Sequence, residues 1–301
     1  MGALHPFSLL FPLMALALSP LLMGVINRTK AAWAGRTGQP LTQMYFDLAR
    51  LWRKGAVYSR TTTWVFRMGP VAGLASALAA LTLTPFGGLP AALSFDGDLL
   101  ALIYLIGAGR FFTILAALDT GSAFEGMGAS REAFFAVFTE VIFILGLAAL
   151  AMQTGSLSLS GMVATSEKFD FAASAMVAAA LFVALLAENA RIPVDDPNTH
   201  LELTMIHEVM VLDHGGPDLA LIEYSRALKW WLFSSILAQA LTPLPGGPGL
   251  AVVYTLTMMT ALAIAAGVVE STMARLRLTF VPQFLMGAGA LSALAVILFL
   301  R

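Results

Sequence analysis

Cysteine is absent from this 301-residue chain. Its absence excludes disulfide bonds, iron–sulfur clusters held by thiolates, haem attached through a CxxCH motif and cysteine-based zinc sites. If the protein belongs to a redox assembly, the redox centres of that assembly lie on other chains. We therefore expect no cofactor in this chain.

Charged side chains are also scarce. They make up 12% of the residues, whereas 58% are hydrophobic, and the mean hydropathy is +0.82. Soluble domains are about half apolar and about a quarter charged. An interior this apolar needs a non-aqueous solvent, so the composition predicts an all-α polytopic membrane protein surrounded by the lipid bilayer. The net charge of −1 gives no indication of nucleic-acid binding, and we expect no such partner.

Apolar runs recur along the whole chain, which we treat as a single integral membrane domain, residues 1–301. A transmembrane helix needs about 20 apolar residues. We predict a bundle of about eight such helices, over residues 7–27, 64–84, 99–118, 132–153, 170–190, 229–245, 249–270 and 280–300. The first run lacks a preceding Lys or Arg and a small-residue cleavage site, so we expect a retained span rather than a signal peptide. The second and seventh runs are rich in Ala and Gly, which suits close helix packing.

Basic residues gather on one side of this predicted bundle. Of the 17 Lys and Arg residues, all but Lys168 and Arg301 lie in or beside the connections 28–63, 119–131, 191–228 and 271–279. Positive charge is retained on the cytoplasmic face of a membrane. The pattern predicts that these loops are cytoplasmic, that both termini are external, and that the protein spans the inner (plasma) membrane. A partner is expected to dock from inside the cell.

The first cytoplasmic loop contains an amphipathic helical pattern. Its apolar positions are Leu41, Met44, Tyr45, Leu48, Leu51 and Trp52. Arg50, Arg53 and Lys54 lie between and after them, and this spacing is typical of a helix with one apolar face. Such a helix lies on anionic lipid, or it grips a soluble partner or lines the mouth of a cavity. Asp47, the only acid of the loop, fits either a salt bridge or a functional role.

A carboxylate lies inside the fourth predicted span, in DTGSAFEGMGASREAFFAVFTEVIFILG. The glycines are not a P-loop, because no GKS or GKT follows. Ser130 is a plausible helix N-cap, which puts Glu140 roughly 12 Å along the helix axis. An acid at this depth costs about 2.5–3.5 kcal/mol unless it is protonated, hydrated or paired. Glu140 is therefore a candidate for ion transfer, with a neutral, hydrogen-bonded side chain as the alternative.

Residues 188–209, ENARIPVDDPNTHLELTMIHEV, concentrate titratable side chains at the end of an apolar run. Glu188 and Arg191 are spaced for an i,i+3 pair. Pro193 ends one helix, and Asp196 with the following proline starts another. His200 and His207 share a face of that second helix. HEVMV lacks the second histidine of a zinc-protease motif because Val211 takes its place, so no metal site is predicted. We expect a bent segment that lines a wet cavity.

These motifs together resemble those of a known family of membrane proteins. They are RTGQP at 36–40 with DLARLWRKG at 47–55, RFFTILAALDTGSAFEGMGASREA at 110–133, Glu140, AENARIPVDDP at 187–197, and VESTMARLRL at 269–278. The chain resembles the superfamily of complex I subunit 1, also designated H, over nearly all its length. Within that superfamily it looks closer to formate hydrogenlyase subunit 4, also called hydrogenase-4 component C, of the group 4 energy-converting hydrogenases.

The resemblance implies a proton relay formed by Glu140, Glu188, Asp195 and Glu202. His200 and His207 are added because the sequence departs from the family after residue 197, and imidazole changes charge near neutral pH. For the partner-docking surface or quinone-like cavity it implies Arg36, Asp47, Arg131, Glu125 and Arg191. No catalytic residue is expected in this chain.

The resemblance also implies partners. These are a soluble arm of iron–sulfur and large hydrogenase-like subunits, which hold iron–sulfur clusters and, in hydrogenases, a nickel–iron centre, and antiporter-like membrane subunits. The expected function is that of a non-redox membrane anchor and proton-coupling subunit. Three alternatives stay open. The first is the quinone-site (H) subunit of NADH–quinone oxidoreductase, and the second is a stand-alone secondary cation transporter, for which the chain lacks the expected repeated halves. The third is a purely structural anchor whose acids are all neutral or paired.

Overall fold

The computed structural model describes residues 8, 10–164, 170–196, 205–241 and 247–300. Its helices are α1 (Leu10–Trp33), α2 (Gln43–Trp52), α3 (Trp64–Leu83), α4 (Asp98–Asp119), α5 (Ala123–Thr154), α6 (Leu159–Ala164), α7 (Phe171–Glu188), α8 (His207–Met210), α9 (Pro217–Leu241), α10 (Pro248–Thr272) and α11 (Val281–Phe299). Within the described residues, 7 helices are long and apolar enough to cross a membrane: α1, α3, α4, α5, α7, α10 and α11. The prediction of an all-α polytopic membrane protein is confirmed.

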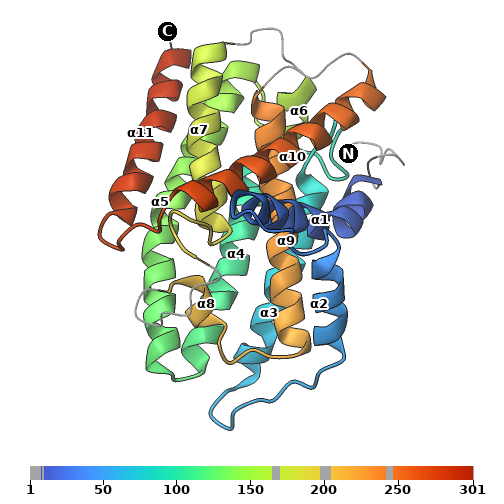
Figure 1. Ribbon diagram of the computed structural model, residues 1–301. Coiled ribbons are helices and arrows are strands. Elements are labelled where there is room, and N and C mark those ends of the chain that lie inside the picture. Colours follow the sequence, from blue (N-terminus) through green and yellow to red (C-terminus); the bar gives the residue numbers. More distant parts are fainter. Residues whose placement is uncertain (1–7, 9, 165–169, 197–204, 242–246, 301) are drawn as a thin grey trace.

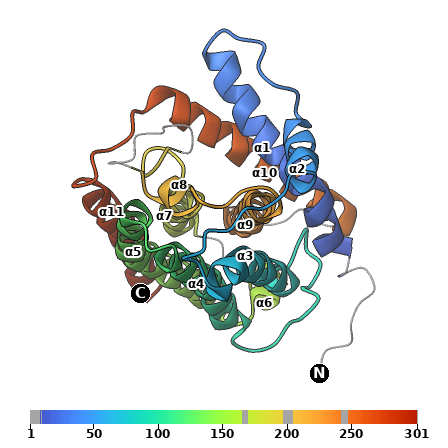
Figure 2. The same cartoon turned by 90° about the horizontal axis from the view of Figure 1, so that it is seen from below.

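Helix α9 differs from the predicted sixth span, 229–245. It starts at Pro217 and is 25 residues long, so it continues through part of the segment predicted as a cytoplasmic loop. Its first half carries Asp218, Glu223, Arg226 and Lys229, and these charges explain why α9 is not among the apolar spans. It nevertheless runs through the middle of the bundle beside α7 (Figures 1 and 2). Trp230 and Trp231 on this helix are buried.

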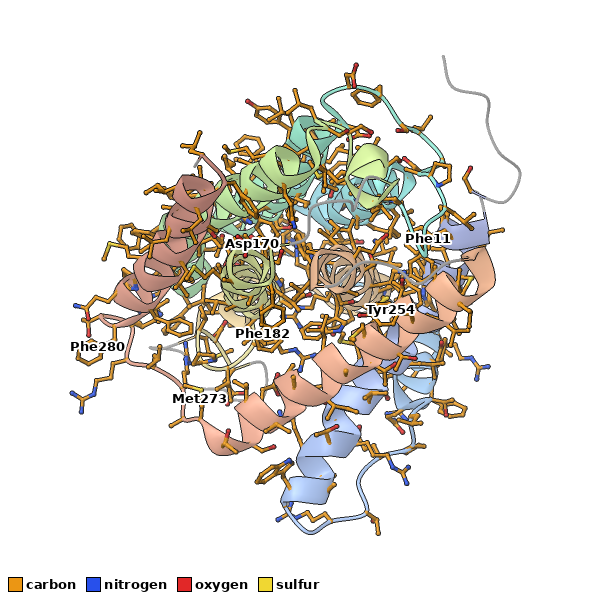
Figure 3. All side chains as sticks on the ribbon, turned by 90° about the horizontal axis from the view of Figure 1, so that it is seen from above. Phe11, Asp170, Phe182, Tyr254, Met273 and Phe280 are labelled. Carbon is orange, nitrogen blue, oxygen red and sulfur yellow. The ribbon has the colours of Figure 1, made fainter. Side chains whose placement is uncertain are left out.

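The long helices form two groups around α7 and α9. Helices α5, α7 and α11 pack together, and α3 packs on both α4 and α9. Helices α1 and α10 contact each other and cross the bundle obliquely (Figure 1). Seen from above, α7 and α9 lie end-on near the centre, whereas Met273 and Phe280, beside the α10–α11 connection, lie at the periphery (Figure 3). The end of α7 at Glu188 and the charged first half of α9 are thereby held inside a ring of apolar helices.

Helix α5 starts earlier than predicted. The expected N-cap, Ser130, lies inside the helix, where its Oγ donates a hydrogen bond to the carbonyl of Met127 at 2.9 Å. The actual N-cap is Ser122. Gly121 adopts a positive φ of 70°, which supplies the turn after α4. Helix α5 therefore begins at Ala123, and the predicted loop 119–131 is mostly helical.

Small residues let helices approach closely, as predicted for the second and seventh spans. A Cβ on Gly69 of α3 would lie 2.6 Å from the Cβ of Ala116 on α4. A Cβ on Gly267 of α10 would lie 2.7 Å from the Cβ of Thr29 on α1. Neither distance is tolerated between carbon atoms, so each glycine is required by its neighbour.

The predicted amphipathic helix is confirmed as α2. It packs against α1 and α9, and the hydroxyl of Tyr45 donates a hydrogen bond to the carbonyl of Ala17 on α1. Phe46 is exposed, and so is Trp52 at the C-terminal end of the helix, although Trp52 was predicted to belong to the apolar face. Helix α2 therefore covers the side of α9 that carries charged residues.

Candidate functional site

Arg110 of α4 is the centre of a polar cluster inside the bundle. Its side chain is 7% exposed; Nη1 lies 2.7 Å from Glu140 Oε1, and Nε lies 3.6 Å from Glu132 Oε1. Nη2 contacts Glu188 Oε1 directly. A single guanidinium group thus neutralises carboxylates from α5 and from the end of α7, which burial would otherwise make costly. We call Arg110, Glu132, Glu140 and Glu188 the Arg110 cluster.

The carboxylates of the Arg110 cluster differ in exposure. The Glu188 side chain is 3% exposed and accepts a hydrogen bond from Thr139 Oγ1 at 3.2 Å. The Glu140 side chain is 45% exposed and borders a shallow groove between α4 and α5, with Gly107 and Phe143 beside it. The cluster therefore extends from the interior to the lateral surface of the bundle.

Asp195 lies on the other side of Glu188 and is 2% exposed. Its Oδ1 lies 2.9 Å from Arg275 Nη2, and its Oδ2 accepts a hydrogen bond from the backbone N–H of His207 at 2.9 Å. Burial raises the pKa of Asp195, although these donors and Arg275 oppose the shift. A void of about 20 Å³ touches Glu132, Glu188 and Asp195, so the space for one water separates Asp195 from the Arg110 cluster.

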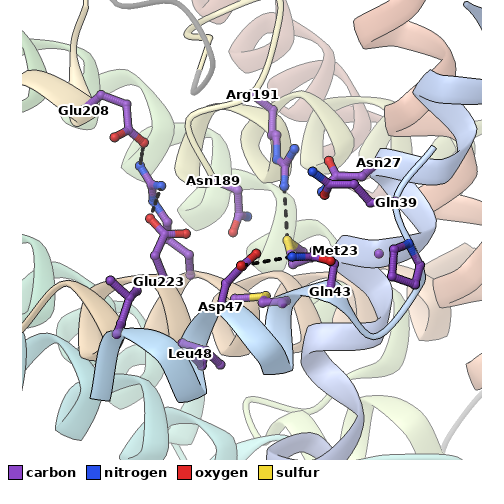
Figure 4. Close-up of a pocket in the computed structure, with 15 residues that line it drawn as sticks. Met23, Asn27, Gln39, Gln43, Asp47, Leu48, Asn189, Arg191, Glu208 and Glu223 are labelled. Carbon is purple, nitrogen blue, oxygen red and sulfur yellow. Dashed lines mark hydrogen bonds and ion pairs between the residues drawn. The ribbon is translucent and has the colours of Figure 1, made fainter. Parts of the chain in front are cut away.

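A larger polar cavity of about 290 Å³ lies between α1, α2, α9 and the segment after α7 (Figure 4). Among its lining residues are Met23, Asn27, Gln39, Gln43, Asp47, Asn189, Arg191, Glu208, Glu223 and Arg226. Two of the residues predicted for such a cavity, Asp47 and Arg191, are in this wall. Helix α2 forms one wall of the cavity through Gln43, Met44, Asp47, Leu48 and Leu51.

Ion pairs and hydrogen bonds organise the cavity wall. Arg226 lies 2.5 Å from Glu208 and 2.7 Å from Glu223. Asp47 accepts a hydrogen bond from Gln43 Nε2 at 3.0 Å. Arg191 Nη2 lies 3.1 Å from the sulfur of Met23, as the dashed lines in Figure 4 show. The wall thus carries acids, amides and cations rather than an unbroken apolar surface.

Three other predicted docking or cavity residues are placed elsewhere. Arg36 is exposed after the end of α1. Arg131 Nη1 donates a hydrogen bond to the carbonyl of Met205 at 2.9 Å. Glu125 is buried and accepts a hydrogen bond from the backbone N–H of Asp213 at 3.2 Å. Arg131 and Glu125 therefore tie α5 to the residues around α8. Their role toward a partner stays a prediction.

The predicted i,i+3 pair between Glu188 and Arg191 is wrong. Helix α7 ends at Glu188, and Ala190 has a φ of 50°, so Arg191 is not on the helix face that carries Glu188. Arg191 Nη1 instead lies 3.1 Å from Glu270 Oε1 on α10. The second partner of Glu270 is Lys30, whose Nζ lies 2.7 Å from Glu270 Oε2.

Of the two predicted histidines, His207 alone is among the described residues. His200 and the acid Glu202 lie outside them. His207 begins α8, not the longer helix expected from residue 196. Burial, with the charges of Arg226 and Lys229, lowers the pKa of His207 well below its usual range, so its imidazole is neutral near pH 7.

The central role of Arg110 was not predicted. It was counted only as a basic residue flanking a loop, although it lies inside the predicted span 99–118. A cation within an apolar span needs a buried acid as a partner. The presence of Glu140 in the fourth span is the sequence signal that could have identified this ion pair.

The seven apolar helices and the buried ion pairs define a polytopic membrane protein with charged side chains in its interior. The chain belongs to the NADH dehydrogenase subunit 1/H family: the family model, described as NADH dehydrogenase, matches residues 7–301. The resemblance drawn from the motifs is thereby confirmed.

Individual relatives agree with this assignment. Formate hydrogenlyase subunit 4 from Escherichia coli (strain K12) is 29% identical over 293 residues, 94% of each chain. Hydrogenase-4 component C from the same strain is 29% identical over 311 residues, 98% of this chain and 95% of the relative. The H subunit of the NADH-quinone oxidoreductase from Rubrobacter xylanophilus is 29% identical over 201 residues, 65% of this chain and 60% of the relative.

A solved structure has the same fold. A chain in the structure of the membrane-bound sulfane sulfur reductase, an archaeal respiratory membrane complex, superposes with a TM-score of 0.83. The match covers 97% of this chain and 98% of that chain, at 20% identity. The relatives are thus membrane subunits of multi-subunit respiratory or hydrogenase complexes.

Proposed function

We propose that this protein is a non-redox membrane-anchor and proton-coupling subunit of a complex-I-like energy-converting hydrogenase or a related oxidoreductase. It links a soluble catalytic arm to ion-translocating membrane subunits. The observation that carries the proposal is the Arg110 cluster, in which Glu188 is buried, Glu140 reaches the lateral surface, and one cation bridges them. A structural anchor alone has no need of several acids inside an apolar bundle, because each one costs free energy to bury.

The order of the polar groups supports a route for protons. The small void beside Asp195 and the groove beside Glu140 share Glu188 as a wall residue. Movement of the Arg110 side chain between carboxylates would change which of them holds a proton, since an ion pair favours the charged form. Protons would enter from the cytoplasmic side near Asp195, Glu202, His200 and His207, and leave toward the groove at Glu140.

The exposed part of Glu140 supports a membrane partner at the groove between α4 and α5. Tyr104 of α4 and Val137 of α5 are 77% and 60% exposed, so the surface around this acid is apolar. A carboxylate facing hydrocarbon is unfavourable. An antiporter-like membrane subunit would cover the groove and offer Glu140 a polar neighbour.

The soluble arm would dock at the end of the bundle that carries α2 and most of the Lys and Arg residues. With no cysteine in this chain, the iron–sulfur clusters, and the nickel–iron centre of a hydrogenase, would belong to the subunits of that arm. The positive-inside pattern supports a position in the inner membrane with both termini external.

The test uses the assembled complex in inverted membrane vesicles, with the electron donor and acceptor that the neighbouring genes identify. Glu140→Gln and Glu188→Gln remove one charge each and keep the side-chain shape. We expect assembly on native gels to be retained and proton translocation, followed by quenching of a pH-sensitive dye, to fall at least 10-fold. Asp96→Asn, in an exposed loop, is the matched control. Unchanged translocation in both Gln variants would refute the proposal.

A quinone-site subunit is the second candidate, and the polar cavity favours it. Its volume of about 290 Å³ is at the lower end of the range of small-molecule sites, about 300–1,000 Å³. Asp47 and Arg191 would offer polar contacts to a headgroup. A photoreactive quinone analogue that labels α2, and that excess quinone displaces, would support this function. Absence of labelling would leave a hydrated cavity as the better description.

A further inference from the structure

The side chains that line the polar cavity carry more negative than positive charge. They include three carboxylates and two guanidinium groups, those of Asp47, Glu208, Glu223, Arg191 and Arg226. The two glutamates share one cation, because Arg226 lies 2.5 Å from Glu208 and 2.7 Å from Glu223. Arg191 contacts Glu270, which lies outside the cavity wall. Among the described residues, neither guanidinium group forms an ion pair with Asp47.

Asp47 is the acid of this wall whose charge is least compensated. Its ion pair in the described part of the chain is with Arg50, whose Nη1 lies 3.9 Å from Asp47 Oδ1 and whose side chain is 67% exposed. An exposed pair at this distance contributes little. The same Oδ1 accepts a hydrogen bond from Gln43 Nε2 at 3.0 Å. The carboxylate of Asp47 can therefore still take a positively charged ligand.

Asn189 supplies a second oxygen atom, from the segment after α7. Its Nδ2 donates a hydrogen bond to the carbonyl of Leu185 at 2.9 Å, which identifies the other end of the amide as the oxygen. Asn189 Oδ1 has no hydrogen-bond partner among the described residues, although Asn189 is only 6% exposed. Asn189 and Asp47 line the same cavity (Figure 4). A buried acceptor without a donor is unfavourable, so this oxygen requires a ligand or a water molecule.

The free groups of the wall are thus oxygen atoms. The amide nitrogens of Gln43 and Asn189 are used within the protein, whereas the carboxylate of Asp47 and the amide oxygen of Asn189 remain. Carboxylate and carbonyl oxygens are the ligands that hard cations prefer. A ligand that only accepts hydrogen bonds would leave Asn189 Oδ1 unsatisfied, and like charge in the wall disfavours an anion.

The charge of the preferred cation follows from the same residues. Within the described part of the chain, no three His, Asp or Glu side chains lie together as a metal chelate, so a divalent cation has no cage of acids. One poorly compensated carboxylate suits a single positive charge. The cavity volume of about 290 Å³ leaves room for such an ion to keep several water molecules.

We propose that the polar cavity binds one alkali cation, Na⁺ or K⁺, between Asp47 of α2 and Asn189 after α7. The inference goes beyond the proposed function, which assigns no ion to this cavity. An ion at this position would connect α2, which packs against α1 and α9, to the end of α7. The site would then hold together the helix and the segment that form opposite parts of the cavity wall.

The absence of cysteine allows a direct test, because a single substitution gives one thiol. Leu48→Cys places the thiol in the cavity wall, whereas Ala49→Cys on the same helix is exposed and outside the cavity. Each purified, full-length variant in detergent is labelled with an uncharged maleimide in NaCl, KCl or choline chloride at equal ionic strength. Choline is the control cation, because methyl groups surround its charge and keep it from direct contact with oxygen ligands.

We expect NaCl or KCl to slow the labelling of Leu48→Cys about 10-fold relative to choline chloride when the ion exceeds its dissociation constant about 10-fold. Labelling of Ala49→Cys should be the same in all three salts. The ion that protects at the lower concentration is the ligand of the site. Equal labelling rates of Leu48→Cys in the three salts would overturn the inference.

Substitutions of the two oxygen ligands identify the site. In the Leu48→Cys background, Asp47→Asn removes the charge, and Asn189→Leu removes the amide oxygen at similar size. Each should raise the half-protecting ion concentration at least 10-fold, whereas Asp96→Asn in an exposed loop should leave it unchanged. Protection that survives both Asp47→Asn and Asn189→Leu would overturn the inference, and Asp47→Asn alone decides it where Asn189→Leu does not fold.

This test is independent of the proposed function. It needs neither a partner subunit nor proton translocation. Loss of ion protection has no bearing on the effects of Glu140→Gln and Glu188→Gln on translocation. Normal translocation in those two variants would refute the proposed function and would leave the ion site intact.

Discussion

Arg110 on α4 and Glu188 at the end of α7 form a direct ion pair, and the same guanidinium group lies 2.7 Å from Glu140 on α5. Through Arg110, α4 is thus joined both to the next long helix, α5, and to the end of α7. In an apolar bundle, each partner lowers the free-energy cost of burying the other. A substitution at one of these positions therefore changes the free-energy cost of burying the charge at the other.

Arg110→Met should be strongly destabilising, because it leaves buried carboxylates without a counter-ion. Removal of one partner from a buried ion pair costs about 3–5 kcal/mol. The measurement is reversible unfolding of the purified subunit in detergent. The double variant Arg110→Met/Glu188→Gln should recover part of the loss, since Gln carries no charge. Additive effects of the two substitutions would contradict the direct coupling.

Most of the fold could be predicted from hydropathy, because long apolar runs have few alternatives to a membrane helix. Prediction failed where charge and helix formation coincide. Helix α9 carries Arg226 and Lys229 inside the bundle. A search for long apolar runs leaves out the charged part of such a helix, so the predicted helix is too short. The start of α5 was missed for a related reason: the segment before Ser130 is helical without being strongly apolar.

The candidate site was predictable only in part. Glu140 could be identified because it lies well inside one predicted span, 132–153, and this can be read from the local sequence alone. The partner of Glu188 is Arg110, 78 residues away in sequence, whereas the expected partner was Arg191, three residues further along the chain. Spacing along a helix applies only while the helix continues, and α7 ends at Glu188.

Asp98 holds the opposite end of the bundle together. It is 0% exposed, and it accepts hydrogen bonds from Ser158 Oγ at 2.8 Å and the backbone N–H of Leu159 at 2.7 Å. Asp98→Asn replaces one accepting oxygen by an NH2 donor, so one of these two buried donors loses its acceptor, and we expect a loss of about 2–3 kcal/mol in the free energy of unfolding. Asp96→Asn, in the exposed loop just before α4, should cost less than about 0.5 kcal/mol. Equal effects in the two variants would argue against this role.

His214 makes stability depend on pH. It stacks on Phe66 with ring centroids 3.9 Å apart, and burial lowers the pKa of His214 to about 4. The unfolded chain, with a pKa of about 6.5 for this residue, binds the proton more readily. The stabilising contribution is therefore complete above about pH 6.5 and is lost as the pH falls toward 4.

Between pH 7 and 5, this linkage predicts a loss of about 2 kcal/mol from His214. The pKa of His207 is lowered too, so His207 acts in the same direction. His214→Gln should then flatten the pH dependence of unfolding by about 2 kcal/mol over this interval without abolishing it. The check is thermal unfolding in detergent at several pH values. If the stability of His214→Gln changes with pH as much as that of the unsubstituted protein, His214 is not a source of the pH dependence.

Gly267 keeps α10 close to α1. A Cβ there would lie 2.7 Å from the Thr29 Cβ and 3.0 Å from the carbonyl oxygen of Ile26. Gly267→Ala should cost about 1–3 kcal/mol through overpacking. Gly287→Ala on α11 is the matched control, because a Cβ there meets nothing within 4 Å, and its better helix propensity should make it neutral or stabilising. Melting temperatures that shift in the same direction would contradict this packing.

Glu270 joins α10 to both α1 and the wall of the polar cavity. Its side chain is 0% exposed, with Lys30 Nζ at 2.7 Å and Arg191 Nη1 at 3.1 Å. Glu270→Gln leaves two cations side by side with no negative charge between them, so a loss of about 3 kcal/mol or more is expected. Lys30→Gln leaves the pair with Arg191 in place, and because the Lys30 side chain is 24% exposed, it should cost only about 1 kcal/mol.

The double variant Glu270→Gln/Lys30→Gln discriminates between a charge effect and simple loss of packing. Removal of Lys30 relieves its repulsion with Arg191, so the double variant should be more stable than Glu270→Gln alone. Loss of packing would instead make it less stable than either single variant. Arg191 also lines the cavity, as does Asp47. Glu270→Gln should therefore also change the rate at which a thiol reagent labels the variant Asp47→Cys. Lys30→Gln should leave that rate unchanged.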